Sequence, residues 1–505
     1  MDRRRFLQAA GIGAGLGLTH TGWSFHDDDS PLMQPTYGEI SGYDVIGFND
    51  MRIPGQPRSP GWDQTYEFRV IDQKGGTFAY CSNGARGWTI VNVTNPRKMF
   101  VVWRQPHTAT QHSSTTDNTQ YIDIKGGNIL VVKRNKALET WDVSNPSAPI
   151  RLASYQPNDI HPTQNAPFHG LWVHEDSRGR FAFSAFRPFD FSGEILDICD
   201  ITNPRVPLTV GRWWYPGMRA GEEPLRTWWS PQNPAAGPEP APQLGLPAPA
   251  VLAHDMTTWH DRCYVAWRDK GLIILDINNL AAPVRVGEVN WADQQLRPTF
   301  DPVLVPNPPS NAAIPMPPLP GQTHSWGLIN PRPGRRVTTI VGGDELGQCP
   351  FGYLHYIDVS NEARPREISG FRTPLNMHAN CPKDRLGNRM GTHDVERYIR
   401  GNITHSAWEE GGFWGIDHSD IHYPKHVAYF VPPVRSDSPR QTGHADDVFV
   451  HDGIIFGSSS DPGAGGLWAL RYKPGFQGTV RWNADESDVI VTPAKRGRRR
   501  GHDDD

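Results

Sequence analysis

Six segments of this chain repeat one pattern: an apolar run ends in Asp or Asn and a short polar turn follows. In five of the six, a proline stands seven positions after the Asp or Asn. An apolar strand, a turn rich in Ser, Thr and Asn, and a second strand opened by proline predict an antiparallel hairpin, because an edge strand tolerates the missing N–H of proline. The key residues are Asn92, Asp142, Asp200, Asp276, Asp358 and Asp417, and the second positions are Met99, Pro149, Pro207, Pro283, Pro365 and Pro424.

The spacing of these hairpins points to one repeated architecture. The key residues follow each other at intervals of 50, 58, 76, 82 and 59, close to the roughly 40–50 residues of a four-stranded propeller blade with added loops. We therefore predict an all-β fold, a single seven-bladed β-propeller over residues 36–490. The seventh blade fits residues 444–472 without the Asp-to-Pro signature. Glu39–Tyr43 is similar to Glu367–Phe371, so we expect an N-terminal strand to complete the last blade and close the ring.

The apolar runs before the turns, such as Leu196–Asp200 and Leu272–Asp276, resemble the LVIVD-repeat family of β-propellers. The resemblance covers about residues 75–475 and implies the propeller fold. It implies little about activity, because much of that family has no assigned chemistry and propellers host many functions.

Composition agrees with a turn-rich fold and limits the partners. The chain holds 50 glycines and 47 prolines, and part of the proline excess lies in two stretches near 217–250 and 299–321. These stretches lack strand periodicity and are expected to be long loops over one face, candidates for a lid. A net charge of −4 gives no electrostatic case for nucleic acid or an anionic membrane. We expect a small-molecule partner at the propeller axis, with a protein partner left open.

The two ends of the chain have biased sequences. Arg3–Arg5, then Phe6-Leu7 and an apolar stretch over 9–18, resemble a twin-arginine signal, and a basic terminus beside a short apolar segment is the alternative. We expect residues 1–30 to be the signal peptide and a flexible lead, and the protein to be periplasmic or secreted. No other segment has the ~18 apolar residues of a membrane-spanning helix. Residues 491–505 are expected to be a disordered charged tail.

Five cysteines without a CxxC motif do not form a zinc-ribbon or disulfide framework. Cys81, Cys199 and Cys263 lie in strand-like runs and are expected to be buried. A disulfide between Cys349 and Cys381 stays an open alternative.

Histidines recur at a second repeated position, the start of the first strand of five consecutive predicted blades. They are His169, His254, His324, His393 and His444. The first strand of each blade lines the central channel of a propeller, so these side chains are expected to converge near the axis. Convergent imidazoles suit a transition metal, because each ring offers a neutral nitrogen donor. The alternative is a structural device that hydrogen-bonds one blade to the next.

These residues support a metal-dependent enzyme as the first hypothesis. Four imidazoles would suit one Fe or Cu ion, and Zn is possible, so an oxidoreductase is favoured over a lyase or hydrolase that acts on a small organic substrate. Asp255 and Asp394 each follow one of the histidines, and we expect them, with Asp446, to orient imidazoles or to act as acid/base groups. The competing hypothesis is a non-catalytic binding or scaffold propeller.

Overall fold

The computed structural model describes most of the chain between residues 37 and 494. The described ranges are 37–52, 64–84, 87–105, 122–125, 128–134, 136–161, 169–228, 251–289, 323–345, 352–371, 373, 391–436, 443–460, 465–486 and 488–494. The predicted signal, the last residues of the tail, Cys349 and Cys381 lie outside these ranges, and so do residues 229–250 and 299–321 of the two proline-rich stretches.

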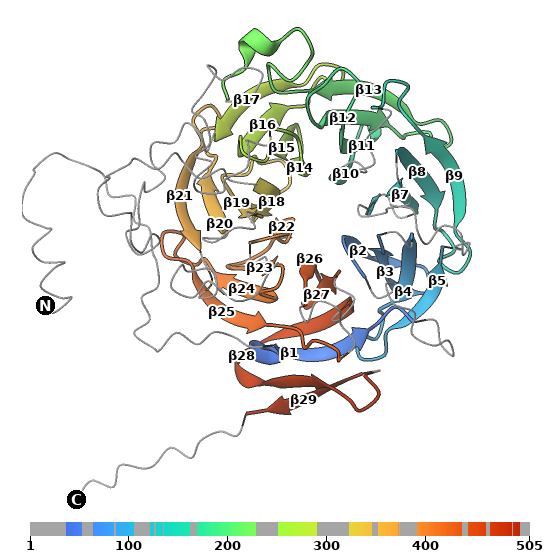
Figure 1. The fold of residues 1–505 in the computed structure, drawn as a ribbon, viewed down its shortest axis with the longest axis vertical. Coiled ribbons are helices and arrows are strands. Elements are labelled where there is room, and N and C mark those ends of the chain that lie inside the picture. The colour runs from blue at the N-terminus through green and yellow to red at the C-terminus, as the bar shows by residue number, and fades with distance from the viewer. Residues whose placement is uncertain are drawn as a thin grey trace, which may run out of the picture.

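The sheets stand side by side in a ring around a common centre, so the chain is an all-β propeller (Figure 1). Four sheets have four strands each. The first contains β2 (Phe68–Gln73), β3 (Gly76–Ser82), β4 (Trp88–Asn92) and β5 (Phe100–Arg104). The second contains β6 (Ile122–Lys125), β7 (Ile129–Arg134), β8 (Ala137–Asp142) and β9 (Ile150–Tyr155). The third contains β10 (Leu171–Asp176), β11 (Gly179–Phe186), β12 (Ile195–Asp200) and β13 (Leu208–Trp213). The fourth contains β14 (Met256–Trp259), β15 (Arg262–Ala266), β16 (Leu272–Asp276) and β17 (Val284–Val289).

The fifth sheet has an extra inner strand. It contains β18 (Thr323–Ile329), β19 (Thr339–Asp344), β20 (Leu354–Asp358), β21 (Arg366–Phe371) and the two-residue β22 (Tyr398–Ile399), which pairs in parallel with β18. The structure therefore differs from the expectation that a full strand follows His393. Residues 393–397 are not assigned as a strand, although they run beside β23: Val395 forms an isolated bridge with Ser406, and the N–H of His393 donates a hydrogen bond to the carbonyl oxygen of Ala407 at 2.9 Å.

The last sheet joins both ends of the described chain. Its order is β23 (Ile403–Ala407), β24 (Phe413–Asp417), β25 (Lys425–Phe430), β1 (Glu39–Asn49), β28 (Gly466–Trp482), β27 (Ile454–Ser459) and β26 (Ala445–His451). The expected N-terminal strand is thus present, and β1 pairs antiparallel with β28 along most of its length. β29 (Val489–Pro493) pairs with β28, so ordered structure extends past residue 490, where the sequence had predicted the propeller to end.

The repeated Asp or Asn builds the same turn in all six copies. Its side-chain oxygen accepts a hydrogen bond from the backbone N–H two residues later, at 2.8–3.1 Å. A β-bulge precedes the key residue in every copy. Short Asx side chains favour this local hydrogen bond, which turns the chain into the outer strand. The predicted hairpins are therefore confirmed.

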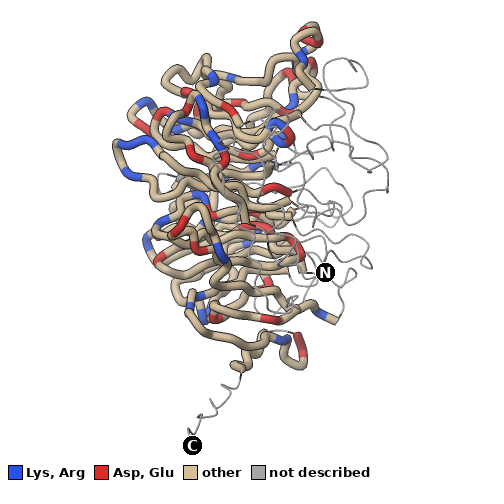
Figure 2. Tube along the Cα trace, turned by 90° about the vertical axis from the view of Figure 1, so that its left-hand side faces the viewer, with Lys and Arg blue, Asp and Glu red and all other residues tan. Residues whose placement is uncertain are grey.

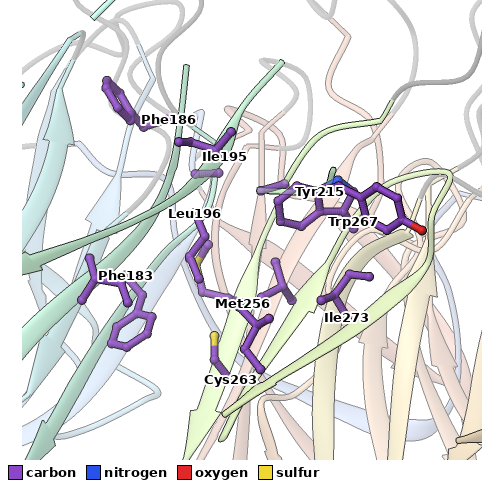
Figure 3. Packing of buried hydrophobic residues seen from close by; sticks show 14 of the residues in the cluster. Phe183, Phe186, Ile195, Leu196, Tyr215, Met256, Cys263, Trp267 and Ile273 are labelled. Carbon is purple, nitrogen blue, oxygen red and sulfur yellow. The ribbon is translucent and has the colours of Figure 1, made fainter. Parts of the chain in front are cut away.

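Packing between neighbouring sheets forms the core (Figure 3). Phe183 and Leu196 of the third sheet belong to one buried cluster with Met256 and Ile273 of the fourth. Cys81, Cys199 and Cys263 are buried free thiols, as expected. The described residues include a single-turn 3-10 helix, η2 (Glu223–Leu225). None of them forms a helix with the length and hydropathy that crossing a membrane requires. Acidic and basic residues are interspersed along the described chain (Figure 2).

Glycines in outer strands let adjacent sheets approach closely. A Cβ added to Gly287 in β17 would lie 1.7 Å from the carbonyl oxygen of Glu362, in the turn of the next sheet. We expect Gly287→Ala to lower the free energy of unfolding by about 1–3 kcal/mol, because the added carbon forces the sheets apart. Urea unfolding should show this as a lower midpoint. Ala281→Ser, at an exposed turn position, is the control and should change stability by less than about 0.5 kcal/mol.

Candidate functional site

The five predicted histidines come together at one end of the channel. His169, His254 and His444 lie just before β10, β14 and β26, His324 lies inside β18, and His393 lies in the segment that runs beside β23. Their rings form a continuous arc in sequence order, with centroid separations of 4.7, 4.2, 3.9 and 5.9 Å. The expected convergence of the rings is therefore found. Four of the five histidines, all except His393, lie within two residues of the start of an inner strand, so equivalent positions of neighbouring sheets meet.

Backbone contacts between neighbouring sheets orient two of the rings. The Nδ1 atom of His254 donates a hydrogen bond to the backbone oxygen of His324 at 3.2 Å. Nδ1 of His393 donates to the backbone oxygen of Asp446 at 2.8 Å. Each bond links one blade to the next. A neutral imidazole that donates through Nδ1 keeps an unprotonated Nε2, which is the arrangement that metal-binding histidines use.

Burial makes two central rings poor bases. His254 and His324 are each 1% exposed. Burial lowers the pKa of His254 well below its usual value, and nearby Arg268 and the other imidazoles add to the effect. Burial likewise lowers the pKa of His324 to about 4, with a further contribution from His393. Both rings are thus neutral at pH 7 and have a lone pair available for a ligand.

The pKa of His393 shifts in the opposite direction from those of His254 and His324, because carboxylates surround its ring. Burial acts to lower the pKa of His393, but the negative charges of Asp446, Asp394 and Glu345 outweigh burial and raise it. Asp446 responds to the same surroundings: burial raises its pKa to about 6, although His393 opposes the change. The site therefore contains neutral imidazoles at its centre and an imidazole–carboxylate pair towards His444.

Two carboxylates complete three-residue groups with pairs of histidines. One ligand atom each from His254, His324 and Glu345 all lie within 4.8 Å of one another, and the same holds for His393, His444 and Asp446. A third group joins Asp394 to His324 and His393. Every group that contains these histidines within the described ranges thus has two imidazoles and one carboxylate.

Asp255 and Asp394 each follow a histidine of the arc and are buried, 1% and 0% exposed. Oxygen atoms of Asp394 lie 3.4 Å from Nδ1 of His324 and 3.2 Å from Nδ1 of His393. The guanidinium of Arg397 pairs with both carboxylates. Of the two roles expected from the sequence, this placement suits orientation of the imidazoles better than direct contact with a substrate.

Sequence reasoning missed Glu345, Arg268 and Glu409, which stand in the loops after β19, β15 and β23. Glu345 pairs with Arg268 and lies 3.9 Å from Nε2 of His324. Isolated bridges join Arg268 to Thr323, and Glu409 to Ala445, so both loops lie beside histidines. Arg268 and Glu409 have φ values of 35° and 38°. Non-glycine residues adopt such conformations at a cost of about 1–3 kcal/mol, most often at functional sites. In the sequence, a tryptophan followed by a charged residue occurs in two of these loops, as Trp267-Arg268 and Trp408-Glu409, and this repeated pair could have revealed them.

The comparisons with known proteins agree with the fold and assign no activity. A family model described as "LVIVD repeat" matches residues 117–156 and 261–290. The chain is thus a β-propeller that carries LVIVD repeats. No curated protein matches its sequence.

Similar solved structures include the WD40 repeats of RRP9, with 8% identity, a TM-score of 0.49, and coverage of 85% of this chain and 100% of that chain. The structure of U3-55K has 9% identity, a TM-score of 0.49, and coverage of 85% and 98%. The Cps50 (Swd1) β-propeller domain of Myceliophteria thermophila has 11% identity, a TM-score of 0.46, and coverage of 83% and 100%. These similarities add nothing to the functional argument, which rests on the residues of the channel mouth.

Proposed function

We propose that this propeller binds a transition metal at the histidine end of its channel and is a metal-dependent enzyme, with an oxidoreductase favoured. The observation that carries the proposal is the group formed by His254, His324 and Glu345, whose ligand atoms lie within 4.8 Å of one another. Two imidazoles and one carboxylate with open positions are the ligand set of non-haem Fe(II) oxygenases. The same set also suits Zn, so a lyase or hydrolase stays the second choice.

The surrounding residues support this ligand role. Neutral His254 and His324 need no deprotonation before they bind a metal. Bound there, the metal would act as a Lewis acid or redox centre towards a small organic substrate. Arg268 pairs with Glu345, so it fixes the direction of the carboxylate. Asp394 contacts the imidazoles of His324 and His393 and holds the orientation of their rings.

The test is elemental analysis of the full chain purified under metal-replete conditions, where we expect at least one transition-metal ion per chain. The double variant His254→Ala/His324→Ala should lose this metal, and its melting temperature should no longer rise on metal addition. His405→Ala is the matched control. His405 is also buried, but it is not one of the five histidines of the arc, and its Nδ1 atom lies 2.7 Å from the hydroxyl oxygen of Tyr43. We expect it to be less stable but to keep the metal. A metal-free wild-type chain would overturn the proposal.

A specific observation also favours the second candidate, a non-catalytic binding or scaffold propeller. His254 and His393 each hydrogen-bond to the backbone of the next blade, as structural histidines would. In that case the double variant should unfold at much lower temperature without any metal present, and the wild-type chain should bind no metal. The two candidates thus predict opposite metal contents for the wild-type chain.

We further propose seven blades and export through the twin-arginine route. The eight-stranded sheet would count as two blades, one built on β23–β25 and one on β26–β28, with β1 as the outer strand of the second. Arg4 and Arg5 would be read by the export machinery, and the folded protein would lie in the periplasm or outside the cell. Replacement of both arginines by lysine, followed by cell fractionation, tests the export proposal.

A further inference from the structure

The histidine arc is longer than the ligand shell of a single ion. Metal–nitrogen bonds of about 2.0–2.1 Å place the ligand atoms of one ion no more than about 4 Å apart. The five rings instead continue through four successive centroid separations of 3.9–5.9 Å. A single ion can therefore bind only some of the five histidines, so the others must have a different role.

Two of the three-residue groups share no residue. His254, His324 and Glu345 form the first, and His393, His444 and Asp446 form the second. Each has the same composition, two imidazoles and one carboxylate. The groups touch where the rings of His324 and His393 approach, with centroids 3.9 Å apart.

We propose that the channel mouth holds two divalent transition-metal ions side by side, one in each of these groups. This inference rests on the proposed function, because it assumes that the histidines bind metal. Adjacent metal ions can hold two oxygen atoms of one small substrate or water between them. The predicted substrate class is accordingly a small molecule with an oxygen-containing group that reaches both ions.

Asp394 links the two groups. Its two oxygens contact Nδ1 of His324, in the first group, and Nδ1 of His393, in the second. Asp394 is itself fully buried and paired with Arg397 at 2.8 Å. It thus fixes the two neighbouring rings relative to each other, and its place suits a positioning residue between two metals.

The charge balance around the mouth favours bound cations. Eight carboxylates stand against four cationic side chains among the buried or nearly buried residues of this region. The carboxylates are Glu67, Asp123, Glu194, Asp255, Glu345, Asp394, Asp446 and Asp447, and the cations are Arg69, Lys133, Arg268 and Arg397. Glu67 is 2% exposed; its two oxygens lie 3.5 Å from Arg69 and 3.7 Å from Arg397 and accept no hydrogen bond. Buried carboxylates in excess need protons or cations to offset them, and two divalent ions would supply the missing charge.

Titration of the chelator-treated full chain with Co²⁺ tests the inference, with bound metal counted by visible absorption and by elemental analysis. We expect two equivalents in the wild-type chain. Glu345→Gln should reduce the count to one by emptying the first group, Asp446→Asn should reduce it to one by emptying the second, and the double variant should bind none. With Mn²⁺, the wild-type chain should give the broadened electron paramagnetic resonance spectrum of a coupled pair, and each single variant the spectrum of an isolated ion.

His451→Ala is the matched control. His451 belongs to an exposed group with Asp72 and Asp452, and the variant should still bind two equivalents. If this variant lost an equivalent, one ion would lie at the exposed group and the inference would be wrong. If the wild-type chain bound only one equivalent of Co²⁺, the inference of a second ion would be wrong, and the proposed function would be unaffected. No bound Co²⁺ would overturn both.

Discussion

A chain that lacks residues 36–50 is expected to lose most of its stability, because this deletion removes β1. The strand pairs with β28 from Glu39 to Asn49 and with β25 at Ile40 and Ser41. Ile40, Tyr43, Val45 and Ile46 are all 7% exposed or less. At about 1.5–3 kcal/mol for each buried large side chain, these four together contribute roughly 6–12 kcal/mol. That range is similar to the whole net stability of an ordinary domain, about 5–15 kcal/mol.

Thermal unfolding measured by circular dichroism and calorimetry checks this expectation. The deletion should abolish the cooperative transition or move it to a much lower temperature. A chain that lacks only residues 1–30 is the control and should melt with the wild-type protein. An unchanged melting curve for the 36–50 deletion would show that β1 is dispensable, in conflict with its position between β25 and β28.

Features encoded once per blade could be read from the sequence. The turn after each key residue depends on one side-chain oxygen and the backbone N–H two residues later, so a local pattern determines a local structure. The likeness of Glu39–Tyr43 to Glu367–Phe371 similarly gave the position of β1. The recurrence of histidine at the strand starts gave the arc, because equivalent positions in a ring of sheets face one axis.

Features that occur only once could not be read in this way. Glu345 enters the site because the loop after β19 folds towards His324, and its partner Arg268 comes from the loop of another sheet. Neither residue repeats from blade to blade. The two-residue β22 also follows from tertiary context: it pairs with β18 of the preceding sheet instead of extending towards β23.

Different residues around the histidines stabilise the fold and form the candidate ligand site. Buried ion pairs of Arg69 and Arg397 hold neighbouring sheets together, while the imidazoles with Glu345 and Asp446 form the groups that could receive a ligand. The positive φ values of Arg268 and Glu409 are a stability cost in the loops at the mouth, which the repeated sheets can offset. A single substitution among these buried ion pairs should therefore affect folding most strongly.

Arg397→Met is expected to lower the free energy of unfolding by about 3–5 kcal/mol, because it leaves buried carboxylates without their counter-charge. Arg397 is 4% exposed, pairs with Asp255 and Asp394, and lies 3.7 Å from Glu67. Methionine retains the apolar stem but none of the charge. Urea unfolding at pH 8 should show the loss. Arg336→Met is the control, because Arg336 is exposed and pairs with Glu362 at 2.9 Å; it should cost less than about 1 kcal/mol.

The destabilisation by Arg397→Met should depend on pH in a defined direction. Burial acts to raise the pKa of Asp394, but Arg397, the largest of the opposing charges, helps to lower it well below its usual value. In the wild-type chain, Asp394 therefore contributes stability above its unfolded pKa of about 3.9 and loses it as the pH falls. Without Arg397, burial raises the folded pKa, so the variant gains stability relative to wild type as the pH falls. The difference between the two proteins should shrink from pH 8 to pH 5, and a difference that stayed constant would show that the lost packing of the side chain, and not its charge, causes the effect.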